Sequence, residues 1–315
     1  MNINIKQDDA LIRKKIIRRN RLFREIPLYA LVAPAIILVA IYSYGSMVGI
    51  VIAFQKFVPT NGLFGSRWIG LENFRTLFNY PNIWNIIRNT VFISVLKMIG
   101  GIIVPVTFAI LLNELVNIRF KRIVQTMVYL PNFLSWVILA GIFRDLLSPS
   151  SGLINKVISA VGFQPIFFLG NPGWFPITMV ITEIWKGFGF GSIIYLAALT
   201  SVDPSLYEAA SIDGANRWRQ TLHITLPGIY STIILMTVLS LGSILNGGFD
   251  QIYNLYSPSV YSTGDILDTF VYRLGIVETK YALSTAAGLF KSVISLGFIL
   301  MSYTLADRVA GYRIF

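Results

Sequence analysis

The sequence predicts an all-α integral membrane protein with six transmembrane helices. Of its 315 residues, 55% are hydrophobic and only 13% are charged, whereas about 25% of the residues in ordinary soluble domains are charged. A helix needs about 20 mostly apolar residues to cross the hydrocarbon core, and its backbone groups must pair within the segment. Six stretches meet this requirement: 27–54, 85–112, 121–146, 174–200, 226–249 and 283–307.

The first stretch follows a basic segment, 1–26, as the apolar core of a signal peptide would. It continues to residue 54, which is too long for a cleaved signal peptide, and no small-residue cleavage site closes it. We therefore expect it to be retained as the first span. The expected organisation is a basic cytoplasmic N-terminal segment (1–26), a six-span domain (27–307) and a cytoplasmic tail (308–315).

The distribution of Lys and Arg predicts which loops face the cytoplasm. With the N-terminus inside, 15 of the 26 basic residues fall on inside segments and 7 on the three outside loops. Cytoplasmic loops carry such an excess of Lys and Arg, so both termini and the 203–223 loop are expected inside. The net charge of +11 fits contact with anionic lipid headgroups. No basic and aromatic nucleic-acid-binding module is present, so nucleic acid is not an expected partner.

The outside loops are predicted to contain short helices but no soluble domain. Segment 55–84 includes GLENFRTLFNYPNIW, which predicts a short interfacial helix before the second span. Segment 147–173 has turn signals around one brief apolar helix. Segment 250–282 is polar and rich in Tyr, and we expect its two spaced acids, Asp265 and Asp268, to lie on an exposed loop.

Residues for catalysis or metal binding are scarce. There is no Cys, and the one His, His223, has no partners at metal-ligand or catalytic spacing. No G-x-x-x-x-G-K-[ST] motif is present to cradle nucleotide phosphates. We expect no catalytic residue, cofactor site or metal site in this chain, and any ATP hydrolysis would belong to a partner.

The segment DPSLYEAASIDGANRWRQTLHITLPGI, 203–229, predicts two short helices. Asp203 can cap the first helix, with Pro204 at its first position, where no N–H is needed. Gly214 permits the left-handed turn that ends this helix. The second helix, ANRWRQTLHI, then re-enters the membrane near residues 226–227. The two helices are expected to form a compact knob on the cytoplasmic face.

The acidic residues of this knob have two possible partners. Glu208 and Asp213 can pair either with Arg217 and Arg219 nearby or with basic residues of a partner protein. The small side chains of the first helix would let a partner approach its backbone closely.

The knob resembles the EAA loop of binding-protein-dependent ABC importer permeases, which has the pattern E-A-A-x-x-x-G followed by I-x-L-P. The positions that carry this resemblance, and the ATPase-coupling role it implies, are Glu208, Ala209, Ala210, Asp213, Gly214, Ile224, Leu226 and Pro227. The stretches VIAFQKF, FKRIVQTMVYLPNFLSWVI and ILNGGFDQIYNLY are similar to permeases of the polysaccharide and complex-oligosaccharide uptake subgroup.

The resemblance implies a fold and a set of partners. The fold would be the type I ABC importer (MetI-like) permease architecture with a cytoplasmic coupling helix, in the cytoplasmic membrane of a bacterium. The chain would form the path for an oligosaccharide or polysaccharide fragment delivered by an extracytoplasmic binding protein. It would pair with a second homologous permease, as a heterodimer, and with two ATPase subunits that bind ATP and Mg. Closure of those subunits would move the coupling helices.

Polar and aromatic residues near the span ends are candidates for the substrate path, because carboxylates, amides and aromatic faces bind sugars. The candidates are Trp185, Lys186, Phe188, Asn246, Phe249, Asp250 and Gln251. Lys186 either contacts substrate or extends to the membrane interface, and aromatic residues near span ends are also typical interface anchors. Lys97 and Lys291 are expected to pair with Glu114, with Glu183 or with a partner chain.

The alternative is a secondary, ion-coupled carrier or another polytopic membrane protein without an ATPase partner. A carrier is expected to contain repeated halves and intramembrane acids for ion coupling. No internal repeat is evident in this chain, and Glu183 is the only clear acidic residue well inside a predicted span.

Overall fold

The computed structural model describes residues 25–242 and 244–310, and it contains six helical passes when each bent helix pair is counted as one. Four continuous helices are long and apolar enough to cross a membrane: Glu25–Phe54, Ile83–Asn113, Phe175–Leu199 and Tyr281–Thr304. Two bent pairs supply the others: Ile118–Phe133 with Trp136–Leu146, and Arg217–Gly228 with Tyr230–Gly242. The predicted all-α fold with six spans is confirmed. The basic segment 1–24 and the end of the tail, 311–315, lie outside the described residues.

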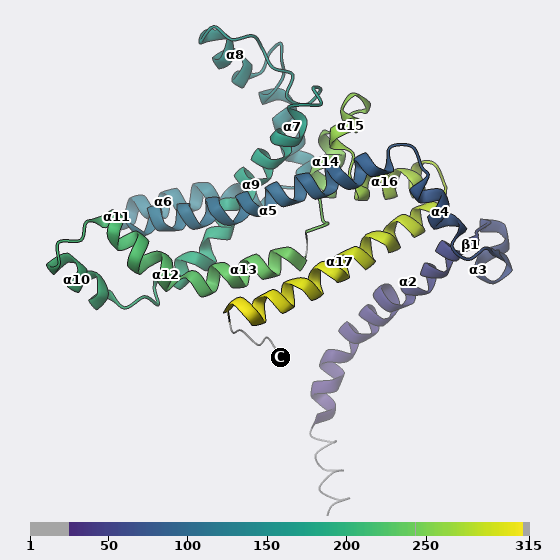
Figure 1. Cartoon of the computed structure of the whole chain (residues 1–315), viewed down its shortest axis with the longest axis horizontal. Coiled ribbons are helices and arrows are strands. Elements are labelled where there is room, and N and C mark those ends of the chain that lie inside the picture. The colour runs from purple at the N-terminus through teal and green to yellow at the C-terminus, as the bar shows by residue number, and fades with distance from the viewer. Residues whose placement is uncertain (1–24, 243, 311–315) are drawn as a thin grey trace, which may run out of the picture.

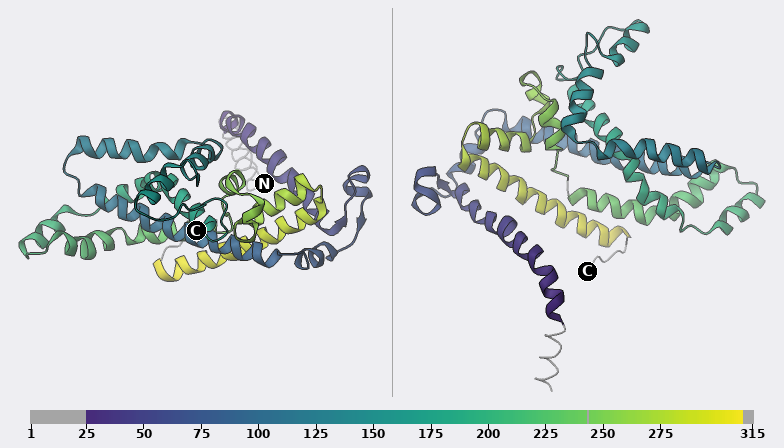
Figure 2. Two further views of the ribbon diagram at one scale, coloured as in Figure 1. Left: turned by 90° about the horizontal axis from the view of Figure 1, so that it is seen from above. Right: turned by 180° about the vertical axis from the view of Figure 1, so that it is seen from behind.

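The first span leaves the helix bundle and lies apart from it over most of its length (Figures 1 and 2). None of its most apolar 18-residue window is buried. It contains a π-helical turn, Ala40–Tyr44, then α2, Gly45–Met47, and a 3₁₀ stretch, Val48–Phe54. The part of the first span that packs extensively on the bundle is the 3₁₀ stretch, which lies against α17 (Tyr281–Ala310).

A small hairpin and the predicted interfacial helix follow the first span. Strands β1, Gln55–Lys56, and β2, Arg67–Trp68, pair antiparallel, with Gln55 opposite Trp68. Between them lie a 3₁₀ turn, Pro59–Asn61, and α3, Gly62–Gly65. The short helix predicted before the second span is present as α4, Glu72–Phe78, and its place at the membrane interface stays a prediction. Asn73 fixes it to the end of the first span, because its side-chain Nδ2 donates to the carbonyl oxygens of Ala53 (2.8 Å) and Gln55 (2.9 Å).

The bundle is built on α5, Ile83–Asn113, and α9, Phe175–Leu199, which form its most extensive helix pair. Helices α13, Tyr230–Gly242, and α17 pack on each other beside this pair (Figure 1). The predicted bounds of the second, fourth and sixth spans agree with these helices to within a few residues.

The third span is broken, whereas the sequence predicted one continuous span at 121–146. Helix α6, Ile118–Tyr129, and the 3₁₀ turn Leu130–Phe133 meet α7, Trp136–Leu146, at an angle of 106°. Leu134 is extended there, and the Ser135 side chain caps α7 by accepting from the N–H of Ile138. Helix α8, Leu153–Ala160, lies beyond α7, away from the bundle (Figure 1). It is the brief helix that the sequence predicted.

The fifth span ends earlier than predicted. Helix α13 stops at Gly242, and α14 begins at Phe249 and ends at Leu255. Residues Ile244–Gly248, here called the break segment, are not helical. The sequence predicted that the fifth span continues to residue 249, but its helix ends at Gly242.

Segment 250–282 is mostly helical and partly buried, so the expectation of an exposed polar loop is wrong. Besides α14 it contains a 3₁₀ turn, Pro258–Val260, then α15, Tyr261–Gly264, α16, Leu267–Tyr272, and a π-helical turn, Arg273–Val277. Asp265 is only 2% exposed and pairs with Arg273, with 2.5 Å between Oδ2 and Nη2. Asp268 pairs with Lys291 of α17. These partners neutralise the buried Asp265 and the half-buried Asp268.

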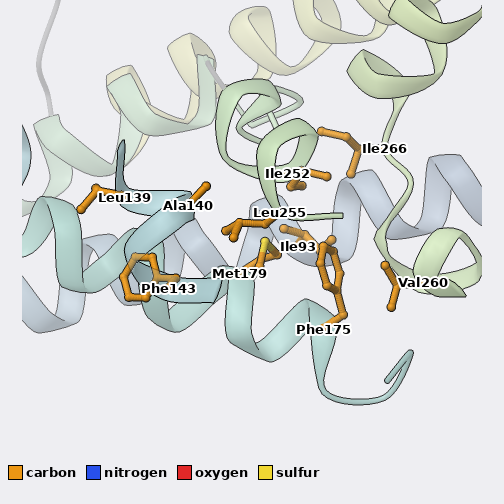
Figure 3. Close-up of a cluster of buried hydrophobic side chains, with 10 residues drawn as sticks. All are labelled: Ile93, Leu139, Ala140, Phe143, Phe175, Met179, Ile252, Leu255, Val260 and Ile266. Carbon is orange, nitrogen blue, oxygen red and sulfur yellow. The ribbon is translucent and has the colours of Figure 1, made fainter. Parts of the chain in front are cut away.

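Three clusters of buried apolar side chains hold the bundle together. Figure 3 shows the largest, in which α14 packs against α5, α7 and α9 through residues such as Ile252, Ile93, Phe143 and Met179. A second cluster joins α4, α16 and α17 at the end of the bundle that carries the hairpin. The third, around Tyr195, lies at the opposite end, near the loop that follows α9.

The predicted two-helix knob is at that opposite end (Figure 1). It consists of α10, Pro204–Ile212, and α11, Arg217–Gln220. A π-helical turn, Thr221–Thr225, and α12, Leu226–Gly228, then lead to α13 with a bend of 57°.

Candidate functional site: a loop knob and a polar cluster between the spans

The start of α10 is capped as the sequence predicted. The Asp203 carboxylate accepts a hydrogen bond from the backbone N–H of Ser205 at 2.9 Å, and Pro204 occupies the first helical position. Hydrogen bonds from Ser205 stabilise the charged carboxylate and lower the pKa of Asp203 below its usual value. The cap fixes the residue at which the chain turns into α10.

The end of α10 is closed by Gly214 in the left-handed conformation, with φ of 76°. The N–H of Ala215 donates to the carbonyl of Ala210 at 2.8 Å, and the N–H of Gly214 donates to that of Ser211 at 3.2 Å. This pair of bonds is the Schellman motif, which favours glycine at this position. The predicted glycine turn is confirmed.

The second helix is locked against the first by side chains. Asn216 caps α11 by accepting from the N–H of Arg219 at 2.9 Å. Gln220 donates to the hydroxyl of Ser211 at 2.9 Å, and the hydroxyls of Tyr207 and Thr225 lie 3.0 Å apart. The knob is therefore one folded unit.

Arg217 has a partner outside the knob. Its Nη1 lies 2.5 Å from Oε2 of Glu114, the residue that caps the end of α5. Glu208 and Asp213 are exposed and form no ion pair within residues 25–242 and 244–310. Pairing of these acids with Arg217 and Arg219 is therefore not found among the described residues, and pairing with a partner protein stays a prediction.

The knob exposes large apolar side chains at the end of the bundle. Ile212 is 87% exposed, Trp218 is 69% exposed and Leu206 is 51% exposed. By contrast, Leu226 packs on the buried cluster around Tyr195. Large apolar side chains that are exposed together, as on α10 and α11, are typical of interaction surfaces.

Lys97, in the middle of α5, is the centre of a polar cluster between the spans. Its side chain is only 10% exposed. The ammonium donates to the carbonyl of Gly247 at 2.8 Å and to the side-chain oxygen of Gln251, and it lies 3.6 Å from Glu183 of α9. The predicted pairing of Lys97 with Glu183 is confirmed.

Lys291 of α17 reaches the same break segment. Its Nζ donates to the side-chain oxygen of Asn246 at 3.0 Å and to Asp268. The acid that pairs with it is therefore Asp268, in the segment between α14 and α17, and not Glu114 or Glu183.

The predicted substrate-path residues fall into two groups. Asn246, Phe249, Asp250 and Gln251 lie together on the break segment and the first turn of α14. Asn246 and Asp250 are exposed. Gln251 is fully buried, and its amide donates to the carbonyl of Met179 and to Thr182 on α9.

The three path residues on α9 contact other elements. Trp185 makes an edge-to-face contact with Phe143, and Phe188 makes one with Phe108. Lys186 donates to the carbonyl of Asn132 at 3.1 Å and lies over the ring of Trp136, at 5.8 Å from its centroid. These residues do not join the cluster around Lys97.

Aromatic residues that the sequence did not single out surround Phe249. Its ring stacks on Tyr253 with 5.2 Å between centroids and packs against Tyr272 at 5.3 Å. Phe249 and Tyr272 also line a cavity of about 400 Å³ together with Asp268 and Tyr281. The repeated Tyr in 250–282 was the available signal, but only the fold brings Tyr272 to Phe249.

Comparison with known proteins adds a family match. Residues 101–311 match the model of the family described as binding-protein-dependent transport system inner membrane component.

Two similar proteins come from Bacillus subtilis (strain 168). The chain is 40% identical over 303 residues to the polygalacturonan/rhamnogalacturonan transport system permease protein YteP, which covers 95% of this chain and 94% of that protein. It is also 40% identical over 281 residues to Protein LplB, over 89% of this chain and 88% of that protein.

A solved structure has the same fold. It is the crystal structure of a bacterial ABC transporter involved in the import of the acidic polysaccharide alginate. The TM-score is 0.84 with 39% sequence identity, over 92% of this chain and 98% of that chain. The same comparison finds the bacterial alginate ABC transporter in complex with an alginate pentasaccharide-bound periplasmic protein, also with a TM-score of 0.84.

Proposed function

This chain belongs to the family of binding-protein-dependent transport system inner membrane components, and on that premise we propose that it is a transmembrane subunit of an ATP-binding cassette importer for an oligosaccharide or polysaccharide fragment. The observation that carries the proposal is the knob formed by α10 and α11. It is capped, closed by a Schellman turn and tied to α5, yet it leaves Ile212 and Trp218 exposed to water.

The knob suits a role in coupling to separate ATPase subunits. We propose that Glu208, Ala209, Ala210, Asp213 and Gly214 form the surface that enters a cleft on the ATPase, and that Ile224, Leu226 and Pro227 join this surface to the fifth span. The exposed acids have no ion pair within the described residues, which supports basic partners on the ATPase. ATP and Mg would be bound by those subunits, and this chain would not itself hydrolyse ATP.

The remaining partners follow from the same proposal. A second homologous permease would form a heterodimer with this chain, and an extracytoplasmic binding protein would deliver the saccharide. The structure of the similar alginate transporter includes a periplasmic protein that holds an alginate pentasaccharide, which supports a binding-protein partner here. The first span, which is unburied over its most apolar window, leaves apolar surface for lipid or for the second permease.

The proposed location is the cytoplasmic membrane of a bacterium, with both termini and the knob in the cytoplasm. The excess of Lys and Arg on the segments assigned to the inside supports this orientation. The opposite end of the bundle, with the hairpin and α4, would face the binding protein.

The proposed substrate path runs along the break segment and the first turn of α14. Asn246 and Asp250 supply exposed polar groups, and Phe249 and Tyr272 supply aromatic faces beside the 400 Å³ cavity. Trp185, Lys186 and Phe188 on α9 remain proposed path residues at a second location. Uronate-containing oligosaccharides are the first substrates to test, because similar proteins are named for polygalacturonan and for the acidic polysaccharide alginate.

The experiment that tests the coupling role is copurification of the ATPase subunits with this chain and its Glu208→Lys variant. Reversing the charge of an exposed residue that makes no ion pair within the described residues is expected to leave the folded chain intact while it weakens ATPase binding. If Glu208→Lys retained both ATPase binding and ATP-coupled uptake, the coupling role of the knob would be wrong. Uptake of uronate oligosaccharides against neutral oligosaccharides of equal length then identifies the substrate class.

A further inference from the structure

We propose that Lys97 is a positioning residue for transport, which holds the break segment and the first turn of α14 in the shape that the substrate path requires. This inference rests on the proposed function, because the path is part of that proposal. Its basis is the set of contacts that the Lys97 ammonium makes with the break segment, with α14 and with α9.

The ammonium connects three elements at one point. It donates to the carbonyl of Gly247 in the break segment and to the side chain of Gln251 in α14, and Glu183 of α9 lies 3.6 Å away. An ammonium has three donors and no acceptor. Two of these donors are used by the path segment, and the carboxylate supplies the opposite charge that a cation at membrane depth needs.

The break segment needs such a donor because its backbone is not helical. Irregular backbone at membrane depth is tolerated where its polar groups find partners within the protein. The carbonyl of Gly247 finds one in Lys97. Gly248 has φ of 85°, and a Cβ at this position would lie 2.7 Å from the Lys97 Nζ. The absence of a side chain at Gly248 therefore allows the ammonium to approach.

Gln251 extends the contact from α5 to α9. It is fully buried, its Nε2 donates to the carbonyl of Met179 at 2.8 Å and to Thr182 Oγ1 at 2.7 Å, and its Oε1 accepts from Lys97. Both ends of the amide are thus used, and the first turn of α14 is fixed to two spans at once. Phe249 and Asp250 lie on this same turn.

Lys291 holds the other side of the break segment. Its ammonium donates to Asn246 at 3.0 Å and to Asp268, so the segment is attached to α17 as well as to α5. A displacement of α5 relative to α17 would change the shape of the segment. Of these two lysines, Lys97 is the one that contacts Gly247 and Gln251, so its replacement removes both contacts.

The chain offers a clean test, because it has no Cys and labels can be placed singly. Spin labels at Ile99→Cys on α5 and Asp250→Cys on α14 report the distance across the Lys97 contact, since both positions are exposed. A second pair, Ile99→Cys with Ile193→Cys on α9, reports the bundle itself. Distances are measured by electron spin resonance in the reconstituted complex, with the partners' cysteines replaced.

Lys97→Met keeps an unbranched side chain as far as Cε and removes the ammonium with its charge. The distance distribution between positions 99 and 250 is expected to broaden, while that between positions 99 and 193 is unchanged, a selectivity that a general structural role would not produce. Uptake at saturating binding protein is expected to fall about tenfold, the effect of losing a hydrogen bond from a charged group. Lys186→Met serves as the control for the distance alone, because Lys186 contacts Asn132 and Trp136 and not the break segment.

An unchanged distance distribution between positions 99 and 250 in Lys97→Met would overturn the inference, as would equal broadening for both label pairs. If the Lys97→Met complex does not assemble, the same two distances are measured in Lys97→Arg. Arginine keeps the charge, but its larger guanidinium does not fit the close approach at Gly248. The distance distribution between positions 99 and 250 is therefore again expected to broaden selectively. The distances do not depend on which substrate is carried. A complex that fails to take up saccharide would therefore contradict the proposed function and leave the distances to decide the role of Lys97.

Discussion

Arg217 forms an ion pair with Glu114, with 2.5 Å between Nη1 and Oε2, and so connects the start of α11 in the knob to the end of α5. Helix α5 also carries Lys97, which contacts the break segment. One continuous helix, Ile83–Asn113, therefore joins the proposed ATPase-coupling knob to the proposed substrate path. We therefore expect a movement of the knob to be transmitted along α5 to the residues around Lys97.

The ion pair predicts a defect in coupling rather than in stability. Arg217 is 77% exposed and Glu114 is 38% exposed, and exposed pairs contribute at most about 1 kcal/mol to folding. Arg217→Gln and Glu114→Gln are each expected to leave the melting temperature of the complex nearly unchanged and to lower the ATPase activity that the loaded binding protein stimulates.

The double variant tests whether the two residues act together. Its stimulated ATPase activity is expected to equal that of either single variant, because one interaction is lost in all three. Arg219→Gln is the matched control, since Arg219 is exposed on the same helix and forms no ion pair within the described residues. Additive losses in the double variant would contradict a direct link between Arg217 and Glu114.

A series at Gly214 tests the left-handed turn that closes α10. At φ of 76° a side chain with a Cβ is strained by about 1–2 kcal/mol, although Asn tolerates this region. We expect ATP-coupled uptake to decrease from Gly to Asn to Ala to Val at position 214. Nothing among the described residues of this chain lies within 4 Å of a Cβ at this position, so the chain itself offers no clash, and the melting temperature of each variant measures the backbone strain separately from ATPase binding. Equal activity of the Asn and Val variants would be inconsistent with this explanation.

Asp203→Ala and Asp203→Asn separate the cap from the charge. The cap accepts from the N–H of Ser205, and its loss in the Ala variant is expected to destabilise α10 by about 1 kcal/mol. Asn also caps helices well, so Asp203→Asn is expected to retain most of the stability. Hydrogen exchange of the amides of residues 205–212 measures the difference, and similar exchange in the two variants would show that the cap does not stabilise α10.

The exposed apolar residues of the knob predict a specific loss of ATPase binding. Trp218→Ala and Ile212→Ala are each expected to weaken the affinity of the ATPase subunits by about tenfold, or 1.4 kcal/mol. Phe64→Ala is the control, because Phe64 is 100% exposed but lies on α3 at the opposite end of the bundle. Binding to the chain in detergent gives the affinities. A Phe64→Ala effect as large as that of Trp218→Ala would indicate nonspecific hydrophobic association.

The features that could be predicted from the sequence depend on neighbours along the chain. A long apolar run is enough to predict a span, and the second and fourth spans begin and end within a few residues of their predicted bounds. The caps and turn of the knob are equally local, because Asp203 contacts Ser205 and Gly214 closes its own helix.

The features that could not be predicted depend on distant contacts. Asp265 is buried because Arg273 neutralises it and because its backbone carbonyl accepts from Asn89 on α5. Asp268 finds Lys291 on another helix. Hydropathy averaged over a window does not reveal the 106° bend after Phe133, since the two halves together form one stretch apolar enough to cross a membrane. Likewise, the many Tyr residues of 250–282 suggest aromatic contacts, but the sequence does not show that Tyr272 meets Phe249.

Saccharide transport through this chain is proposed to require ATP hydrolysis by its partners, and uptake into proteoliposomes measures that requirement. The reconstituted complex, supplied with saccharide-loaded binding protein, is given ATP inside the vesicles or an ion gradient across the membrane. We predict uptake that requires ATP and the binding protein and that persists when ionophores collapse every ion gradient. Uptake that an ion gradient drives without ATP would rule out ATP-driven import and favour a secondary carrier.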